Sequence, residues 1–325
     1  DYKFGDGWVA TVELLYSKDI NAIYHDNIGL YRTEQFVNDG GAGNARPYYN
    51  GYYSDREGNQ KAANHVVMLR NTSKGHSLYT TFQLQKNFVD GILKGLYLNG
   101  SYSFGQSRGV TDGTSSVATS AWKYRAALDG NAEEVGYTAG SFDGRLLLSA
   151  SYTANWSKYA ATSFGLIYQR YRPFRYSYCY NGDANGDSQF SNDLMYIPAN
   201  FDEVKDHLLP GDFDSQEDAW KAMNAFIEQD PYLSKHRGEY AERNGAVAPF
   251  ANQLDLSVSH DIKIYQKNGR SHTLRFSFNI ANFLNLLNRN WGVVQTTVLG
   301  NQQYQFLTIP KGCLLYTSDA ADDLI

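Results

Sequence analysis

Hydrophobic and polar residues alternate along "RLLLSASYTANW", residues 145–156. Successive side chains of an extended chain point to opposite faces, so this stretch has one apolar face that ends in aromatic rings. The apolar side carries Leu146, Leu148, Ala150, Tyr152, Ala154 and Trp156, and the other side carries Leu147, Ser149, Ser151, Thr153 and Asn155. The pattern predicts a β-strand whose apolar face meets either a protein core or lipid.

The same period of two recurs along the chain and predicts further strands. It is found in "WVATVELLY" (residues 8–16), "LYLNGSYSFG" (96–105), "TSFGLIYQRY" (162–171), "NQLDLSVSHDI" (252–262) and "TLRFSFNIANF" (273–283).

Soluble β-sandwiches also alternate, but three features of these strands favour a membrane barrel. The strands run about 9 to 12 residues, which is the length a tilted strand needs to cross a bilayer and longer than is usual in soluble proteins. Their polar faces carry mostly Ser, Thr, Asn and Gln, with few Lys or Glu. Aromatic residues cluster at strand ends, as they do in the girdles of membrane barrels.

The connections between the strands point the same way, because short and long ones alternate. Long loops without secondary structure are uncommon in compact soluble domains, whereas a membrane barrel has turns on one side and loops on the other. We expect tight links near Ser17–Asp19, Phe88–Leu93, Ser157–Tyr159 and Tyr265–Ser271, and long segments at roughly 30–75, 106–143 and 173–250.

The predicted fold is therefore all-β, an antiparallel up-and-down transmembrane β-barrel with long extracellular loops. About eight to ten strands are expected, one or two of them in "WGVVQTTVLGNQQYQFLTI" (residues 291–309). An open edge in lipid would leave backbone groups unpaired. We therefore interpret residues 1–312 as an incomplete part of a larger barrel.

Composition and charge narrow the function classes. The net charge of −5 gives no basic footprint, so no nucleic-acid partner is expected. Aromatics reach 15% with 26 Tyr, which suits strand ends at a polar boundary because the ring is apolar and its hydroxyl is not. The sequence has no run of about 18 apolar residues, the signal of a membrane-spanning helix.

The two ends of the sequence carry their own signals. The chain begins at Asp1 without Met or a signal peptide, so we expect a mature, trimmed or partial chain. Residues 313–323, "CLLYTSDAADD", resemble one reading frame of a sequencing adapter, and we expect residues 313–325 to be a non-native tail. An ordinary polar C-terminus is the alternative.

Several sequence segments in the long loops and last strands resemble those of a known family. These are "LLYSKDINAIYHDN" (14–27), "YSYCYNGDANGDSQFSNDLMYIP" (176–198), "FIEQDPYLSKHRGEYAERNGAVAPFANQLDLSVSHDI" (226–262) and "FNIANFLNLLNRNWGVV" (278–294). Together they resemble the C-terminal barrel part of TonB-dependent outer-membrane receptors, in the Oar-like (OmpA-related) branch. The resemblance covers residues 1 to about 310.

This resemblance implies a barrel of about 22 strands with an N-terminal plug. It also implies capture of an extracellular ligand at the cell outer membrane and import energised through the TonB complex. The plug, its TonB box and the terminal strand with its closing aromatic are not in this sequence.

"DANGD" places Asp183, Asn185 and Asp187 at the first, third and fifth positions of a loop, as a calcium loop does. Oxygen side chains at alternate positions of a tight turn converge on one point, which suits a hard cation. The twelfth position holds Leu194 instead of an acid, and Asp193 falls one residue short. Calcium is therefore a possible cofactor, and a structural turn without metal is the alternative.

"SQEDAWKAMNAFIEQDP" predicts a short loop helix near residues 216–229. Ser215 can cap it, Asp218 sits at its third position and Pro231 follows its end. Its apolar stripe should pack on neighbouring loop residues, and a helix that contacts the ligand is the alternative. Mixed charges in "KHRGEYAERNGA" (235–246) favour a solvated, salt-bridged loop over a substrate site.

Two further sets of residues are candidates for contact with a transported molecule. Asp255, Arg275 and Asn279 alternate with apolar residues and are expected to face the lumen, with Asp255 and Arg275 as an ion pair on consecutive strands. Loop aromatics could stack on a sugar or peptide, although packing within the loop explains them as well. They are Tyr48, Tyr49, Tyr52 and Tyr53.

The seven histidines show no metal-binding spacing, and the sequence has no nucleophile elbow or phosphate-binding loop, so we expect no enzyme. The expected function is TonB-dependent uptake of a large nutrient through a plugged barrel, with specificity in the loops. The alternatives are a passive porin or surface adhesin with a similar barrel, and a soluble calcium-binding domain that recognises glycans.

Overall fold

The computed structural model of the chain describes residues 1–37, 46–54, 56–62, 65–113, 115–206, 208–265, 271–295, 303–308 and 316–317. The fold is mostly β-strand with few helices, as the alternation predicts. Within this described part of the chain, no helix is both long and apolar enough to cross a membrane.

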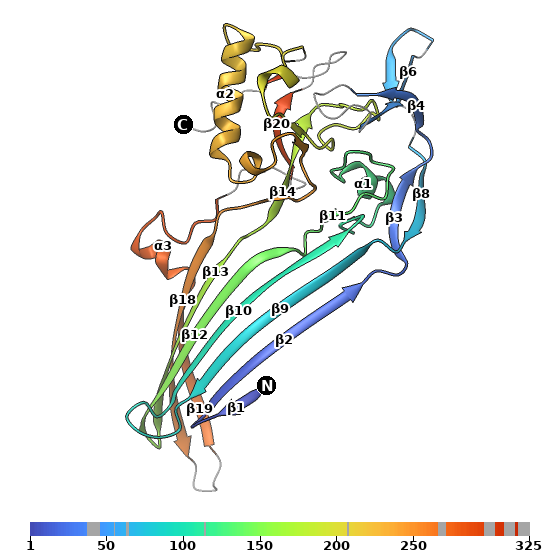
Figure 1. The fold of residues 1–325 in the computed structure, drawn as a ribbon. Coiled ribbons are helices and arrows are strands. Elements are labelled where there is room, and N and C mark those ends of the chain that lie inside the picture. Colours follow the sequence, from blue (N-terminus) through green and yellow to red (C-terminus); the bar gives the residue numbers. More distant parts are fainter. Residues whose placement is uncertain are drawn as a thin grey trace.

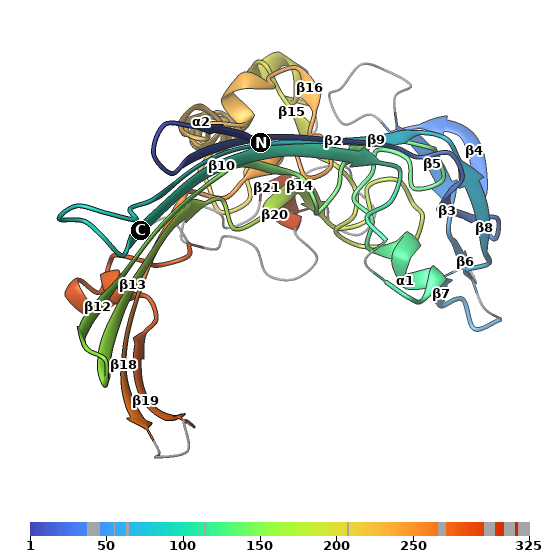
Figure 2. The ribbon, with the colours of Figure 1, turned by 90° about the horizontal axis from the view of Figure 1, so that it is seen from below.

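One large antiparallel sheet forms the body of the molecule, and it is curved (Figures 1 and 2). Its first and last strands do not pair with each other, so the described residues form an open sheet and no closed barrel. In order across the sheet, its strands are β1 (Tyr2–Phe4), β2 (Trp8–Lys18), β9 (Gly75–Asn87), β10 (Leu96–Gly109), β12 (Phe142–Ser157), β13 (Ala160–Tyr171), β18 (Ala251–Tyr265) and β19 (Ser271–Ile280). The short β11 (Gly136–Tyr137) pairs with β10.

Short and long connections alternate along this sheet, and each kind lies at one end of it (Figure 1). The prediction of a tight link near Ser17–Asp19 is wrong. β2 ends at Lys18, and the chain then makes a long excursion before it returns as β9, the partner of β2. The short connections are residues 5–7, 88–95, 158–159 and 266–270, the last outside the described residues, and the long ones are 19–74, 110–141 and 172–250.

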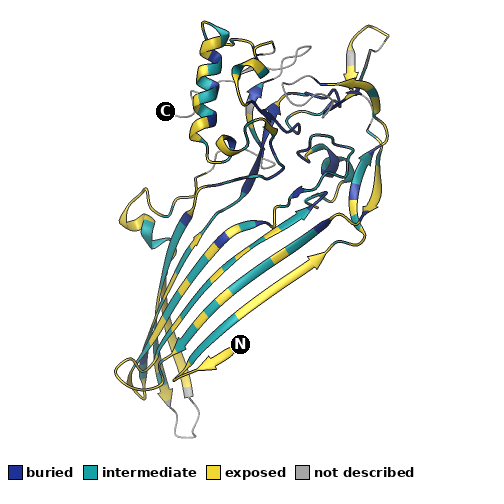
Figure 3. Ribbon diagram, viewed as in Figure 1, coloured by how far each residue is buried: buried dark blue, intermediate teal, exposed yellow. Residues whose placement is uncertain are grey.

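The burial pattern of the two faces of the sheet is the reverse of that in a soluble protein, where apolar side chains are buried and polar ones are exposed. Along β9 and β10 large apolar side chains such as Phe82, Leu84 and Leu98 are exposed, while most of the polar residues between them are half-buried, which gives the alternating bands of Figure 3. The apolar face is continuous, since opposite residues in the register share it from β2 to β19. Leu148 in the middle of the sheet is 42% exposed and Phe278 on β19 is 66% exposed.

The opposite face is held together by hydrogen bonds between uncharged side chains on neighbouring strands. The pairs are Thr81–Ser103 at 2.9 Å, Gln83–Asn99 at 2.7 Å, Thr153–Ser163 at 3.0 Å and Gln169–Gln253 at 3.0 Å. These bonds satisfy the donors and acceptors of the uncharged side chains on this face.

The three long connections fold together at one end of the sheet into what we call the cap, together with residues 303–308 (Figure 1). Its small strand pairs are β3 (Ala22–Asn27) with β8 (Val67–Thr72), β4 (Tyr31–Phe36) with β5 (Pro47–Asn50), β6 (Tyr52–Ser54) with β7 (Gln60–Ala62), and β15 (Tyr196–Ile197) with β16 (Glu239–Tyr240). A further sheet has the order β17 (Ala246–Val247), β14 (Arg175–Asn181), β20 (Gln303–Thr308) and β21 (Tyr316–Thr317), with β14 and β20 parallel. The helical elements are α1 (Ala118–Lys123), α2 (Gln216–Gln229), η1 (Phe201–Glu203) and η2 (Leu233–Lys235) in the cap, and α3 (Phe283–Leu287) after β19.

The described residues of the stretch 291–309 therefore do not add a strand to the main sheet, contrary to the expectation. Residues 291–295 contain no strand, and β20 pairs with β14 in the cap. Residues 296–302 and 309 lie outside the described part of the chain.

The main hydrophobic core of the molecule lies in the cap and not on the main sheet (Figure 3). The predicted loop helix is confirmed as α2, where the Ser215 side chain accepts a hydrogen bond from the amide of Asp218. Its stripe of Ala219, Met223 and Ile227 is buried against tyrosines of β14 and residues of β15, as expected. Burial of the two larger side chains, Met223 and Ile227, stabilises the cap by about 1.5–3 kcal/mol each.

Substitution of Ile227 tests this core. Ile227 is fully buried, so Ile227→Ala should lower the free energy of unfolding of the cap by about 2–5 kcal/mol because it leaves a cavity. Lys221→Ala on the exposed side of the same helix is the control and should change it by under about 0.5 kcal/mol. Denaturant unfolding followed by tryptophan fluorescence measures both, and equal midpoints would show that the stripe is not a core.

Candidate functional site

Residues 183–193, which we call the acidic loop, follow β14. Backbone amides of this loop bind the Asp183 carboxylate. Asp183 accepts hydrogen bonds from the amides of Gly186 (2.7 Å), Asp187 (3.1 Å) and Ser188 (2.8 Å). Asn185 accepts another from the amide of Asp187 at 3.0 Å. A short acceptor side chain that binds amides just ahead of it stabilises a tight turn, so the spacing in "DANGD" produces a compact loop.

The glycine in this loop is required by a neighbouring segment. Gly186 has φ of +74°, and a Cβ there would lie 2.4 Å from the carbonyl oxygen of Tyr49. The amide of Tyr49 donates to the carbonyl of Asn185 at 2.6 Å, and the amide of Gly51 donates to that of Gly186 at 2.8 Å. Two segments that the sequence marks separately, the tyrosines and the acidic loop, are thus in direct contact.

The contact changes the interpretation of the tyrosines. Tyr49 is 3% exposed and donates from its hydroxyl to Asp129 at 2.7 Å, so its proposed stacking on a ligand is wrong, because the ring is covered. Tyr52 donates to Asp183 at 2.8 Å and is half-buried. Tyr48 keeps an exposed ring, and the side chain of Tyr53 lies outside the described residues.

Asp193 binds a buried arginine from the first long connection. The Asp193 carboxylate accepts from Arg46 Nη1 at 2.8 Å and from the amide of Ala184 at 2.8 Å. Arg46 is fully buried, and its guanidinium lies 5.5 Å from the ring centroid of Tyr180 and 5.4 Å from that of Tyr240. This ion pair joins two connections of the cap across the acidic loop.

The acidic loop concentrates negative charge away from water. Asp187 and Asp193 are each 1% exposed, and Asn185 is equally buried. Burial raises the pKa of Asp193 to about 7, against the opposing effect of Arg46. Burial, followed by repulsion from Asp193 and Asp183, raises the pKa of Asp187 well above its usual range. Burial also raises the pKa of Asp183.

Several buried oxygens in the same loop have no hydrogen-bond partner among the described residues. They are Asp187 Oδ2, Ser188 Oγ and Asn192 Oδ1. A buried polar atom without a partner costs free energy, so each requires an explanation such as a water or an ion. No group of three His, Cys, Asp or Glu side chains in the described part of the chain is arranged to hold a metal ion as it stands.

Other buried arginines bind backbone carbonyls where the connections meet the sheet, and no local pattern in the sequence marks them as buried. Arg125 and Arg243 both donate to the carbonyl of Val110, at 2.9 and 2.6 Å. Burial, followed by repulsion from Arg243, lowers the pKa of Arg125 to about 10. Arg243 is 3% exposed, which corrects the expectation that "KHRGEYAERNGA" is solvated throughout.

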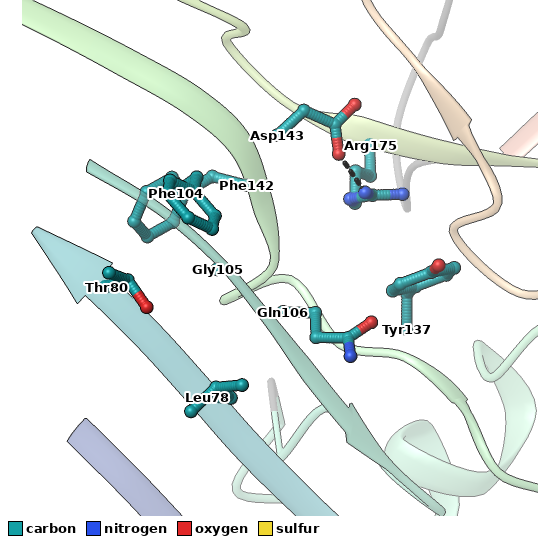
Figure 4. A pocket seen from close by; sticks show the side chains of 9 residues that line it. All are labelled: Leu78, Thr80, Phe104, Gly105, Gln106, Tyr137, Phe142, Asp143 and Arg175. Atoms are coloured by element: carbon teal, nitrogen blue, oxygen red, sulfur yellow. Dashed lines mark hydrogen bonds and ion pairs between the residues drawn. The ribbon is translucent and has the colours of Figure 1, made fainter. Parts of the chain in front are cut away.

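A pocket of about 300 Å³ lies where the cap meets β9 and β10 (Figure 4). Arg175 pairs with Asp143, and its guanidinium lies 4.2 Å from the ring centroid of Tyr137. Phe104 and Phe142 line the pocket beside this charged pair. The pocket thus offers aromatic rings with one cation and one carboxylate, a combination that suits a polar ligand with an apolar part.

Asp255, Arg275 and Asn279 all lie on the polar face of the main sheet, since each alternates with residues of the apolar face in the register. The expected ion pair between Asp255 and Arg275 is wrong. Arg275 binds Asp261, its direct partner in the register, at 2.6 and 2.7 Å. Asp255 accepts from the Gln253 side chain at 3.0 Å and from the amide of Asn282 at 2.7 Å.

Comparison with known proteins gives no relative. The chain matches no family model, no curated protein and no solved structure. Any functional conclusion must therefore come from the faces of the sheet and from the cap.

Removal of the Arg46 side chain tests whether it joins the connections of the cap. Arg46→Ala leaves Asp193 buried without its ion pair, which should destabilise the cap by about 3–5 kcal/mol. Arg32, which is half exposed and 3.6 Å from Asp129, provides the control. Arg32→Ala should cost under about 1 kcal/mol, because an exposed pair is weak.

Amide hydrogen exchange in residues 183–194 is the measurement. Faster exchange in the Arg46 variant and unchanged exchange in the Arg32 variant is the expected result. Equal protection in both would mean that Arg46 does not hold the acidic loop.

Proposed function

We propose that this chain is part of the transmembrane barrel of an outer-membrane receptor for TonB-dependent uptake, with ligand recognition in the cap and no catalytic role. The observation that carries the proposal is the reversed burial pattern of the main sheet. A continuous apolar face is open, while the other face carries hydrogen-bonded Ser, Thr, Asn and Gln side chains. Lipid outside and a polar lumen inside would satisfy both faces.

The free energy gained when apolar surface leaves water supports lipid as the medium around the apolar face. Transfer of apolar surface out of water stabilises by roughly 25 cal/mol per Å², and side chains such as Val12 and Phe276, 65% and 58% exposed, would gain much of this in hydrocarbon. Soluble proteins rarely expose a contiguous apolar patch of more than a few hundred Å².

Aromatic residues with polar atoms at the two ends of the apolar face also support this placement. Near the short turns, Trp156 donates from Nε1 to Thr162 at 2.7 Å. Near the cap, Tyr168 donates from its hydroxyl to Asn252 at 2.8 Å. Amphipathic rings at both ends of an apolar band are typical of the two membrane interfaces.

The two edges of the main sheet are open, so a barrel would need further strands to pair with them. Within the described residues, β19 pairs only with β18, and β2 is covered on its other side only by the short β1. Unpaired backbone groups are not tolerated in hydrocarbon. We propose that further strands of a larger barrel close these edges, as the resemblance to TonB-dependent receptors implies.

The cap would be the extracellular end of this barrel. Its packed core and buried arginines hold the long connections in one arrangement. The pocket beside Arg175 and Asp143 lies at the base of this cap (Figure 4). Leu78, Thr80 and Phe104 of its lining lie on the apolar face of the sheet. We therefore propose that the cap as a whole, rather than this pocket, contacts the extracellular ligand before import, which the TonB complex would drive through a plug domain.

A pair of neighbouring substitutions tests the orientation of the sheet. Leu148 lies on the apolar face opposite Tyr168, and Ser149 lies on the polar face. In a barrel, Leu148→Arg should destabilise the folded protein by up to about 2–4 kcal/mol, because it places a cation in hydrocarbon. Ser149→Arg should cost much less, because a lumen hydrates the added charge.

Folding of the intact receptor that carries each substitution into phospholipid vesicles, followed by urea titration, measures the difference. If Leu148→Arg is tolerated as well as Ser149→Arg, or the wild-type chain melts sharply and reversibly without lipid or detergent, the membrane proposal fails.

Energised uptake is distinguished from a passive porin or adhesin by its dependence on the inner membrane. In cells that express the intact receptor, uptake should stop when a protonophore collapses the proton gradient, while ligand binding at the surface persists. Uptake that continues under these conditions would favour the porin.

A further inference from the structure

We propose that the acidic loop of the cap binds one calcium ion through oxygens of residues 183–193 and that this ion locks the loop onto the first long connection. The inference concerns the cap alone and does not depend on the membrane proposal. It rests on unpartnered buried oxygens, on uncompensated charge and on the contacts that the loop makes.

Three buried oxygens of the acidic loop lack a hydrogen-bond partner among the described residues. Asp187 is 1% exposed, and its Oδ1 accepts from the amide of Gln189 at 2.8 Å, while its Oδ2 has no partner in the described part of the chain. Ser188 Oγ and Asn192 Oδ1 are buried without partners in the same loop. All three are oxygen atoms, the ligand type that calcium requires.

The charge of the loop points to a cation. Asp183, Asp187 and Asp193 influence one another electrostatically. Asp187 and Asp193 are each 1% exposed, and Asp183 is half-buried. Arg46 is the one cation paired with them in the described residues, and its ion pair goes to Asp193. Buried charges are normally paired or bound to a metal, and a divalent ion would neutralise the remaining two carboxylates.

Calcium fits this loop better than a smaller or softer ion. The described residues offer no set of three His, Cys, Asp or Glu ligands, so neutral oxygens from Asn, Ser or backbone carbonyls must complete the shell. Calcium accepts six to eight such oxygens in an irregular arrangement. Magnesium requires near-octahedral geometry and usually keeps several waters, which a site with Asp187, Asn192 and Ser188 only 1%, 3% and 7% exposed does not favour.

Only modest rearrangement is needed for the ion to enter. Asp187 Oδ2 has no bond to lose within the described structure. Asp183 can keep its amide bonds, because a carboxylate oxygen has more than one acceptor site. Bound calcium would fix the loop against Tyr52, which donates to Asp183, and against the Tyr49 and Gly51 backbone.

The experiment uses the full chain folded in detergent micelles, freed of metal by chelation. Calcium binding is measured by isothermal titration, and terbium luminescence provides a second readout because Tyr52 lies in contact with Asp183 and can sensitise a nearby lanthanide. Magnesium is titrated separately as the competing hard cation. The variant is Asp187→Asn, which preserves the shape and the Gln189 contact but removes the charge.

The matched control is Asp212→Asn, the same change at an exposed carboxylate in the same long connection. We expect the wild type and Asp212→Asn to bind one calcium with equal affinity, more tightly than magnesium. Asp187→Asn should bind at least about 10-fold more weakly, the usual order of a lost metal ligand or its support.

The wild-type titration decides the proposal even if Asp187→Asn does not fold. Absence of calcium binding by the folded wild type overturns it, and so does equal affinity in the Asp187 and Asp212 variants. Calcium-dependent protection of residues 46–52 from amide exchange in the wild type supports the bracing role, and unchanged exchange on saturation with calcium overturns that role.

Discussion

The apolar face of the main sheet needs a medium that removes it from water, and most of the architecture follows from that need. The backbone of this sheet is paired internally along seven long strands, so its surface can be apolar without leaving peptide groups unsatisfied. The face is contiguous and has no cover from the described residues. The hydrogen-bonded polar face, the aromatic strand ends and the separation of turns from long connections are all consistent with hydrocarbon as that medium.

The cap, in contrast to the main sheet, buries its apolar side chains within the protein. It has a hydrophobic core around α2 and β14, as a soluble domain does, but it joins segments of irregular backbone. Such segments expose many carbonyl groups that no ladder satisfies. Buried arginines meet this demand, since one guanidinium offers five donors. Arg125 and Arg243 converge on Val110, and Arg46 binds both Asp193 and the Leu194 carbonyl.

Local patterns predicted the strands, their faces and the loop helix, because these depend on spacing within about ten residues. They failed where the outcome depends on distant partners. Residues 22–27 form a strand, but β3 pairs with β8 and not with β2, and alternation does not specify the partner of a strand. The register of β18 with β19 places Asp261, not Asp255, opposite Arg275. The burial of Arg46 has no local signal, since its partners lie 147 and 148 residues away.

The separation of Arg46 from Asp193 also has a consequence for the order of assembly. Contacts between residues so distant in sequence form late, because the intervening chain must first be positioned. Four long strands of the main sheet and the short β11 lie between these two residues. Docking of the two connections should therefore be among the last steps of maturation, and an immature molecule would display its acidic loop open to proteases and chaperones.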